Sequence, residues 1–130
     1  MSAFGFIDKI EEFKKGESLT ACYTLTGNEE FLKDHFKNFP VMPGVLLLET
    51  AKQAAAAFLR MSQGSEVRQY RLTHAGEVRF GQFIKPGSVL KIFVRLLKNE
   101  CGANTFEGRI DLKNAPFGKA LSATITLVPV

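Results

Sequence analysis

The segment VLLLETAKQAAAAFLRM, residues 45–61, decides the fold of this 130-residue chain. Alanine and leucine, which are strong helix formers, fill most of it, and Pro43 and Gly44 stand at its expected start. Apolar residues occupy nearly every side of the predicted helix, so we expect the helix to be buried on most sides. Two charged residues, Glu49 and Lys52, interrupt this apolar stretch. The stretch is therefore too short and too polar to span a bilayer.

After the helix, the chain alternates between apolar and polar residues with a period of two, whereas residues 35–44 before it are irregular. Residues 19–25 also show this alternation clearly, which is typical of a strand. Residues 6–13 are compatible with either a strand or a short helix. One helix followed by antiparallel strands predicts a single α+β domain over residues 1–130, with the sheet curved around the helix. Between turn-rich breaks we expect four more strands, over residues 70–83, 89–98, 105–113 and 120–128.

Composition and charge narrow the class of protein. Hydrophobic residues make up 45% and charged residues 23%, as in a folded domain. The net charge of +4 favours an acidic partner, but the scattered basic residues do not form a nucleic-acid-binding block. Cys22 and Cys101 form neither a disulfide framework nor a metal-type pair. Residues 1–13 lack the features of a signal peptide, so we expect a cytoplasmic protein with reduced thiols.

The segment DHFKNFPVMPGVLLLE, residues 34–49, carries the candidate chemistry. His35 is a base that titrates near neutral pH. The free N–H groups of Gly44 and Val45, at the expected helix start, can bind developing negative charge. Glu49 is a lone carboxyl in an apolar helix, where desolvation would tend to hold its proton. A base, an anion-binding helix start and a carboxylic acid together suit proton abstraction next to a carbonyl.

Structural explanations compete with these chemical ones. A histidine in a proline-rich loop, such as His35, is more often a hydrogen-bonded structural residue. Glu49 has the alternative of facing water or a lysine. His74 lies in an expected strand and is best interpreted as a partly exposed structural histidine. With two distant histidines and no clustered cysteine or aspartate, we expect no metal site and no cofactor.

The same segment resembles the 3-hydroxyacyl-acyl-carrier-protein dehydratases of the FabZ type. Their pattern is roughly G-H-F-P-x-x-P-V-x-P-G-V-L-x-x-E-x-x-x-Q. A second resemblance lies at residues 78–80 and 84–87, which read VRF and IKPG. The resemblance implies a hotdog fold, in which an antiparallel sheet wraps around a long central helix. The gapless matches to the pattern are His35, Phe36, Pro40, Val41, Pro43, Gly44, Val45, Leu46, Glu49 and Gln53.

The resemblance also implies a role for individual residues in a reversible dehydration. His35 would remove the proton from C2 of a 3-hydroxyacyl thioester, and Glu49 would protonate the departing 3-hydroxyl. The Gly44 N–H would polarise the thioester carbonyl. The Val41 carbonyl would orient the imidazole, and Gln53 would fix the carboxyl of Glu49. Glutamate in place of aspartate at position 49 favours dehydration without isomerisation of the double bond.

Partners follow from the same resemblance. The substrate would ride on an acyl carrier protein, and a homodimer would build each active site from the histidine of one subunit and the glutamate of the other. Trimers of such dimers are common in the family. Candidate residues for the lining of an acyl tunnel are Phe36, Phe39, Phe80 and Phe83. Candidate contacts for the acidic carrier protein are Lys37, Arg60, Lys85 and Lys91.

Several positions depart from the family pattern. Asp34 replaces the glycine before the histidine, Lys37 and Asn38 replace Pro-Gly, and Ser88 replaces the aspartate of P-G-D. These departures indicate a divergent member, which could serve a specialised lipid pathway. Two other functions stay open at this point. One is an acyl thioesterase on the same fold, with Glu49 activating water, and the other is a non-catalytic hotdog subunit that binds acyl chains or a partner.

Overall fold

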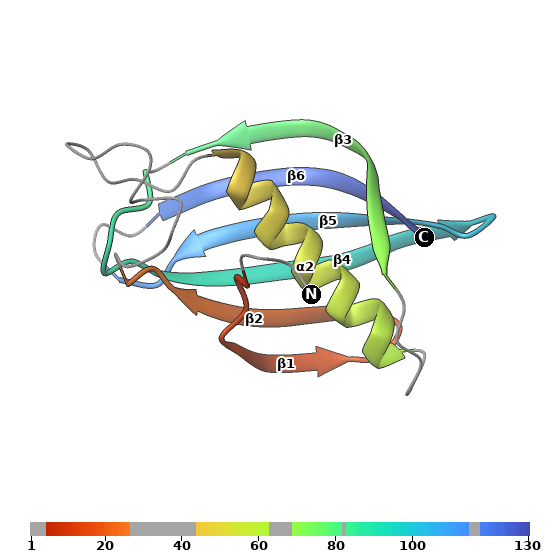
Figure 1. Ribbon diagram of the computed structural model, residues 1–130, viewed down its shortest axis with the longest axis horizontal. Coiled ribbons are helices and arrows are strands. Elements are labelled where there is room, and N and C mark those ends of the chain that lie inside the picture. The colour runs from red at the N-terminus through yellow and green to blue at the C-terminus, as the bar shows by residue number, and fades with distance from the viewer. Residues whose placement is uncertain (1–4, 27–43, 63–68, 82, 115–117) are drawn as a thin grey trace.

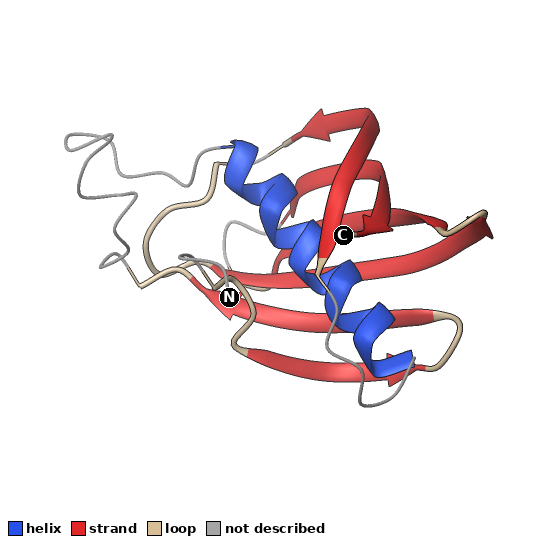
Figure 2. Cartoon of the chain, turned by 45° about the vertical axis from the view of Figure 1, so that its right-hand side comes forward, coloured by secondary structure: helices blue, strands red, loops and turns tan. Residues whose placement is uncertain are grey.

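A computed structural model describes residues 5–26, 44–62, 69–81, 83–114 and 118–130 of the chain. In this part of the chain, six strands form one sheet and a single long helix lies across one of its faces (Figures 1 and 2). This arrangement confirms the predicted α+β hotdog plan. The elements are β1 (Lys9–Lys14), β2 (Ser18–Thr24), α2 (Gly44–Ser62), β3 (Tyr70–Phe80), β4 (Val89–Glu100), β5 (Ala103–Leu112) and β6 (Gly118–Pro129).

The sheet has the strand order β1-β2-β4-β5-β6-β3, and every neighbouring pair is antiparallel. The helix stands between β2 and β3 in the chain, while β3 lies at the opposite edge of the sheet from β1. In Figure 1, α2 begins near β3 and runs diagonally across the sheet to end near β1. The helix therefore crosses the strands that form the centre of the sheet.

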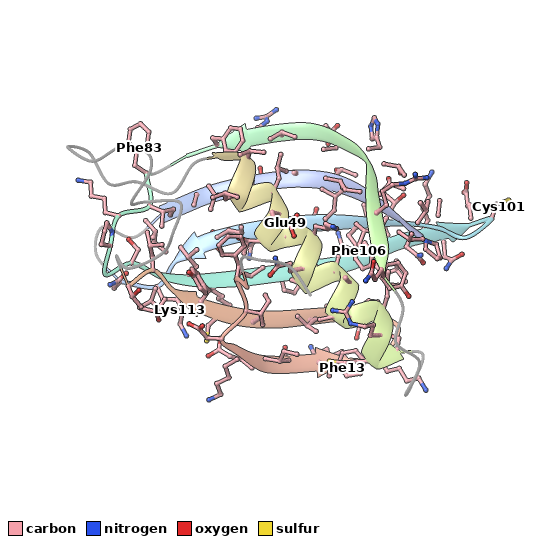
Figure 3. The ribbon with its side chains drawn as sticks, viewed as in Figure 1. Phe13, Glu49, Phe83, Cys101, Phe106 and Lys113 are labelled. Carbon is pink, nitrogen blue, oxygen red and sulfur yellow. The ribbon has the colours of Figure 1, made fainter. Side chains whose placement is uncertain are left out.

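Small residues bring the helix close to the sheet. A Cβ atom built on Gly108 in β5 would lie 3.6 Å from the Cβ of Ala51, so the glycine and the alanine stack at the crossing point. Near the end of the helix, the ring of Phe58 makes edge-to-face contacts with Phe106 at 5.6 Å and with Phe13 at 5.8 Å between ring centroids. Figure 3 shows these two partners on different strands. The aromatic contacts thus join α2 to both β5 and β1.

The helix is fully buried toward the sheet and partly buried on most of its other side. Its far face carries Glu49 and Lys52, which are partly exposed, and Val45, which is 70% exposed. The prediction of burial on most sides is therefore confirmed, with Val45 and Met61 as the exposed residues of the helix and with partial burial on the face away from the sheet. The helix of the described chain is also short of the apolar length needed to cross a membrane. The buried residues of α2 are Leu47, Thr50, Ala51, Ala54, Ala55, Ala56, Phe58 and Leu59.

Strand β3 differs most from its prediction. It ends at Phe80, so the predicted range 70–83 was too long. The Gly81 N–H donates to the Ala120 carbonyl at 2.9 Å, and the chain then leaves the sheet. Apolar residues recur as far as Phe83, although the alternation itself is broken at Gly81 and Gln82, and this explains the overestimate. The pairing of β3 with β6 also shifts register twice, and Glu77, in the second shift, has a positive φ of 50°.

The other boundaries agree closely with the sequence. Residues 6–13, which were ambiguous, contain most of strand β1. Strands β4 and β5 extend further than predicted because they form a tight hairpin around Cys101 and Gly102. These two residues have φ values of 52° and 82°, as the left-handed turn of a two-residue hairpin requires. Next to the turn, the Asn99 amide donates to the Asn104 side-chain oxygen at 2.6 Å.

The hairpin turn generates a first prediction. Replacing Cys101 by asparagine should stabilise the protein by about 1 kcal/mol, because asparagine tolerates positive φ better than cysteine does. Thermal unfolding followed by circular dichroism measures the change. Cys101→Ser is the matched control, since it removes the thiol without improving the turn. A melting temperature for Cys101→Asn at or below that of Cys101→Ser would contradict the turn assignment.

The end of β3 generates a second prediction. A Cβ atom on Gly81 would come within 2.0 Å of the Lys119 carbonyl oxygen, which is backbone and cannot swing away. We expect Gly81→Ala to lower the free energy of unfolding by about 1–3 kcal/mol, as overpacking does. Gly5→Ala serves as the control because nothing lies within 4 Å of its added Cβ. Equal denaturant midpoints for the two variants would contradict the close approach.

Candidate active site

The structure locates six of the predicted site residues. These six lie in α2, at the end of β3 and just after it: Gly44, Val45, Glu49, Gln53, Phe80 and Phe83. The other four lie outside the described residues: His35, Phe36, Phe39 and Val41. Predictions for the second group therefore stay predictions.

Glu49 belongs to a chain of hydrogen bonds that begins in the N-terminal segment. The Phe6 N–H donates to the Gln53 Oε1 at 2.8 Å, and the Gln53 Nε2 donates to the Glu49 Oε2 at 3.0 Å. Glu49 and Gln53 are four residues apart, so they share a face of the helix. Phe6 is itself fixed, because its buried ring packs edge to face on Tyr23 at 5.5 Å between centroids. The carboxyl of Glu49 is therefore held from one side by an anchored amide.

The other oxygen of Glu49 faces a cation. The Lys52 Nζ lies 3.9 Å from the Glu49 Oε1, and the Glu49 side chain is 30% exposed. The sequence led us to expect a desolvated carboxyl, but the described chain gives Glu49 partial access to solvent and a lysine neighbour. The alternative that Glu49 faces water or a lysine thus describes the single protomer. The spacing of three residues between Glu49 and Lys52 was a visible signal for this contact.

The start of the helix lies against the end of β3. Gly44 is the first residue of α2, and the first turn contains no acidic side chain. The first N–H groups of a helix have no partner within it, and the helix dipole adds partial positive charge there. A Cβ atom on Gly44 would lie 2.9 Å from a ring carbon of Phe80. Glycine therefore lets the aromatic ring approach the helix start closely.

Exposed apolar side chains gather near this helix start. Phe80 is 56% exposed, Phe83 is 67% exposed and Val45 is 70% exposed. Figure 3 shows Phe83 beyond the end of β3, on the side of the molecule where α2 begins. Exposed apolar groups of this size are typical of surfaces that bind a ligand or a partner. Two of the predicted tunnel residues, Phe80 and Phe83, thus lie near the predicted carbonyl-binding groups.

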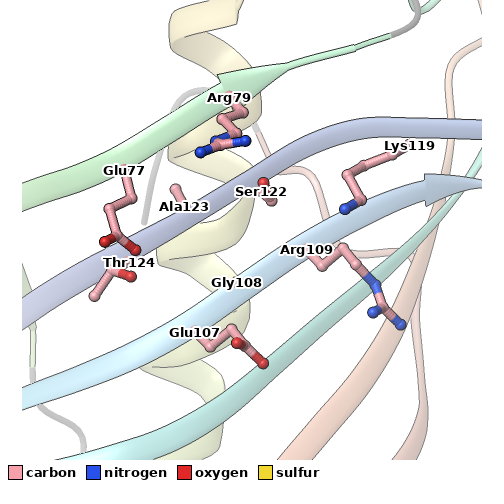
Figure 4. Close-up of a pocket in the computed structure, with 9 residues that line it drawn as sticks. All are labelled: Glu77, Arg79, Glu107, Gly108, Arg109, Lys119, Ser122, Ala123 and Thr124. Atoms are coloured by element: carbon pink, nitrogen blue, oxygen red, sulfur yellow. The ribbon is translucent and has the colours of Figure 1, made fainter.

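A hollow that the sequence did not predict lies away from the candidate site. It has a volume of about 370 Å³ and lies on the face of the sheet opposite the helix, which runs behind the strands in Figure 4. Charged and polar side chains dominate its lining, so the hollow does not suit an acyl chain. Its lining residues are Glu77, Arg79, Glu107, Gly108, Arg109, Lys119, Ser122, Ala123 and Thr124.

The remaining candidates are dispersed. Cys22 lies half-buried on β2 and Cys101 is exposed at the hairpin turn, and both are free thiols. His74 lies exposed on β3, as its structural interpretation predicted. Among the described residues, no group of three or more His, Cys, Asp or Glu side chains could hold a metal ion.

Sequence comparison identifies the family. A family model for the FabA-like domain matches residues 1–114. The 3-hydroxyacyl-[acyl-carrier-protein] dehydratase FabZ of Levilactobacillus brevis is 35% identical over 100 residues, which cover 77% of this chain and 68% of that protein. The FabZ of Lactobacillus helveticus is 33% identical over 125 residues, which cover 95% of this chain and 81% of that protein.

Solved structures with little sequence identity support the fold. The dehydratase heterocomplex ApeI:P from Xenorhabdus doucetiae contains a chain with a TM-score of 0.79 and 17% identity, and the match covers 97% of this chain and 83% of that chain. A Streptococcus mutans protein bound to acetyl CoA has a TM-score of 0.72 and 14% identity, with coverage of 100% and 93%. The chain thus belongs to the FabA-like domain family, as a divergent member of the FabZ type of 3-hydroxyacyl-[acyl-carrier-protein] dehydratases.

Proposed function

We propose that this protein catalyses the reversible dehydration of a 3-hydroxyacyl thioester to the trans-2-enoyl thioester, with His35 as base and Glu49 as acid. The observation that carries the proposal is the anchored carboxyl of Glu49. Gln53 holds it at 3.0 Å in a helix whose start, Gly44, lies beside exposed aromatic side chains. Family membership supports the same reaction, since the relatives are dehydratases by name.

In the forward direction, His35 takes the proton from C2 of the substrate. The electron pair of the C2–H bond forms the C2=C3 double bond, and the C3–O bond breaks. The leaving hydroxide takes the proton of Glu49 and departs as water. His35 is then protonated and Glu49 is a carboxylate, so the reverse hydration starts from this state without any further co-reactant.

The start of α2 would stabilise the charge that develops on the thioester carbonyl. Removing the C2 proton shifts negative charge onto the carbonyl oxygen, and free N–H groups at a helix start are suited to receive it. Gly44 supplies the first of these groups and Val45 the next. The carbonyl of Val41 would accept the other ring proton of His35 and so fix which ring nitrogen acts as the base.

The substrate class follows from the surroundings of this site. The phenyl side chains of Phe80 and Phe83, together with Phe36 and Phe39, would contact the acyl chain. The net charge of +4 would attract an acidic acyl carrier protein. Such a substrate would place the enzyme in the cytoplasm, within fatty-acid or related lipid synthesis.

A homodimer would complete the site. Strand β3 ends the sheet and pairs only with β6 among the described strands, so its other edge can pair with a second copy. The face of α2 that carries Glu49 is also partly exposed in the single chain. We propose that a second copy covers both features and brings its own His35 to Glu49. Such dimers would assemble into trimers of dimers, as is common in the family.

The first test of this proposal is an activity assay with two variants. Purified protein is incubated with 3-hydroxyacyl and trans-2-enoyl thioesters of several lengths on acyl carrier protein. We expect His35→Ala and Glu49→Gln each to lower kcat by about 10²–10⁴-fold, as the loss of general acid–base catalysis does. Glu107→Gln is the matched control, because this exposed glutamate pairs with Arg95 on the opposite face of the sheet.

Other results would remove the proposal. Full activity in folded His35→Ala or Glu49→Gln would exclude the assigned roles. Release of free thiol from the acyl thioester, without interconversion, would indicate the thioesterase instead. No conversion at any chain length by folded wild-type protein would indicate the non-catalytic subunit.

The shared site generates a further prediction. A dimer that combines one His35→Ala subunit with one Glu49→Gln subunit would contain one intact site, if the two residues come from different subunits. Co-expression of the two inactive variants should therefore restore about a quarter of the wild-type activity, because half of the randomly paired dimers are mixed and each has one site. The purified mixture should elute as a multiple of the 14.4 kDa chain. Absence of any recovery in dimers shown to be mixed would exclude the shared site.

A further inference from the structure

The proposed mechanism assigns no role to Lys52, the cation beside Glu49. Helix α2 contains one acidic side chain, Glu49, and two basic ones, Lys52 and Arg60. All other positions of this apolar helix are neutral. Lys52 stands at a position that the family pattern leaves open between Glu49 and Gln53. The location of this lysine next to the proposed acid needs a physical reason.

The two oxygens of the Glu49 carboxyl have different neighbours. Oε2 accepts a hydrogen bond from the Gln53 Nε2 at 3.0 Å, so it acts as the acceptor oxygen of the group. Oε1 faces the Lys52 Nζ at 3.9 Å, which is longer than a hydrogen bond and within the range of an ion pair. Oε1 is therefore the oxygen that faces the lysine, and a cation at this distance favours negative charge on it.

A contribution to fold stability is a poor explanation for this pair. Ion pairs between partly exposed side chains on one helix add little to stability, and the Lys52 side chain is 28% exposed. Both residues lie on the helix face that a second copy would cover. Covering that face would remove water from between the two groups and strengthen their attraction.

We propose that Lys52 is a positioning residue for the dehydration, which holds Oε1 of Glu49 in place and stabilises the negative charge formed there. The inference rests on the proposed function. When Glu49 gives its proton to the leaving hydroxide, Oε1 becomes anionic while the ammonium of Lys52 stands beside it. Gln53 fixes one oxygen through a hydrogen bond, and Lys52 acts on the other through its charge. Lys52 makes no bond to the substrate and exchanges no proton.

The test compares kcat and KM of the wild type with two variants of this lysine. Lys52→Met keeps the length of the side chain and removes the charge, and it should lower kcat about tenfold while KM changes less than about twofold. Lys52→Arg restores the cation and should recover most of the lost kcat. Lys113→Met is the matched control, because Lys113 also pairs with a glutamate, Glu11, at 3.1 Å but lies away from the helix. Melting temperatures are measured for all four proteins.

The outcomes separate this inference from the proposed function. If Lys52→Met retains the kcat of Lys113→Met while Glu49→Gln is inactive, Lys52 does not position the acid and only the present inference falls. A raised KM with unchanged kcat would show that Lys52 binds substrate, and would overturn it as well. If Lys52→Arg fails to recover kcat while both variants melt early, the role is structural. Wild-type protein without dehydratase activity would overturn both proposals.

Discussion

The contact of α2 with the concave side of the sheet is the interaction on which the rest of the structure depends. The strands alone would expose their inner apolar face, and the helix alone would expose a stripe of leucine, alanine and phenylalanine. Ala51 over Gly108 lets the two surfaces approach closely, and Phe58 then joins the helix to β5 and β1. Once this contact is made, the start of the helix lies at the end of β3. The candidate site forms at that junction.

The two faces of α2 have different roles. Small and apolar residues toward the sheet provide burial, together with Thr50, whose hydroxyl donates to the Leu46 carbonyl, while the opposite face carries Glu49, Lys52 and Gln53. Polar groups in this part of an apolar helix are costly unless they are hydrogen-bonded or paired. Here the amide of Gln53 is bonded to Phe6 and to Glu49, and the carboxyl is also close to a cation. The face left open by the sheet is thus organised before any partner arrives.

Much of the fold could be predicted from the sequence, because the patterns that indicate a helix or a strand are local. The alanine-rich segment predicted the helix to within one residue at each end, and the alternation of residues 19–25 predicted β2 with a shift of one residue. The end of β3 was not predicted correctly, since apolar residues recur up to Phe83 while the departure from β6 is set by the backbone contact of Gly81. The membership of one sheet was equally non-local, because the paired residues of β2 and β4 stand 65 to 77 positions apart in the sequence, with α2 and β3 between the two strands.

The candidate site was also predictable only in part, for its local contacts and not for its long-range ones. The spacing of Glu49 and Gln53 predicted their contact, because four residues make one helical turn. The exposure of Glu49 was not predictable from an apolar stretch, since it depends on which face the sheet covers. The anchoring of Gln53 by Phe6 was missed, because it joins residues 47 positions apart. The hollow on the face of the sheet opposite the helix was missed too. It forms only when three paired strands bring Arg79, Ser122 and Arg109 side by side.

The two register shifts of β3 also bear on how this chain behaves at high concentration. An edge strand with straight, regular pairing groups would accept almost any extended peptide and could seed fibres. The irregular backbone around His74 and Glu77 interrupts the row of groups that such a peptide would need. The edge of this sheet is thereby less suited to pair with an arbitrary extended peptide than a regular edge strand would be.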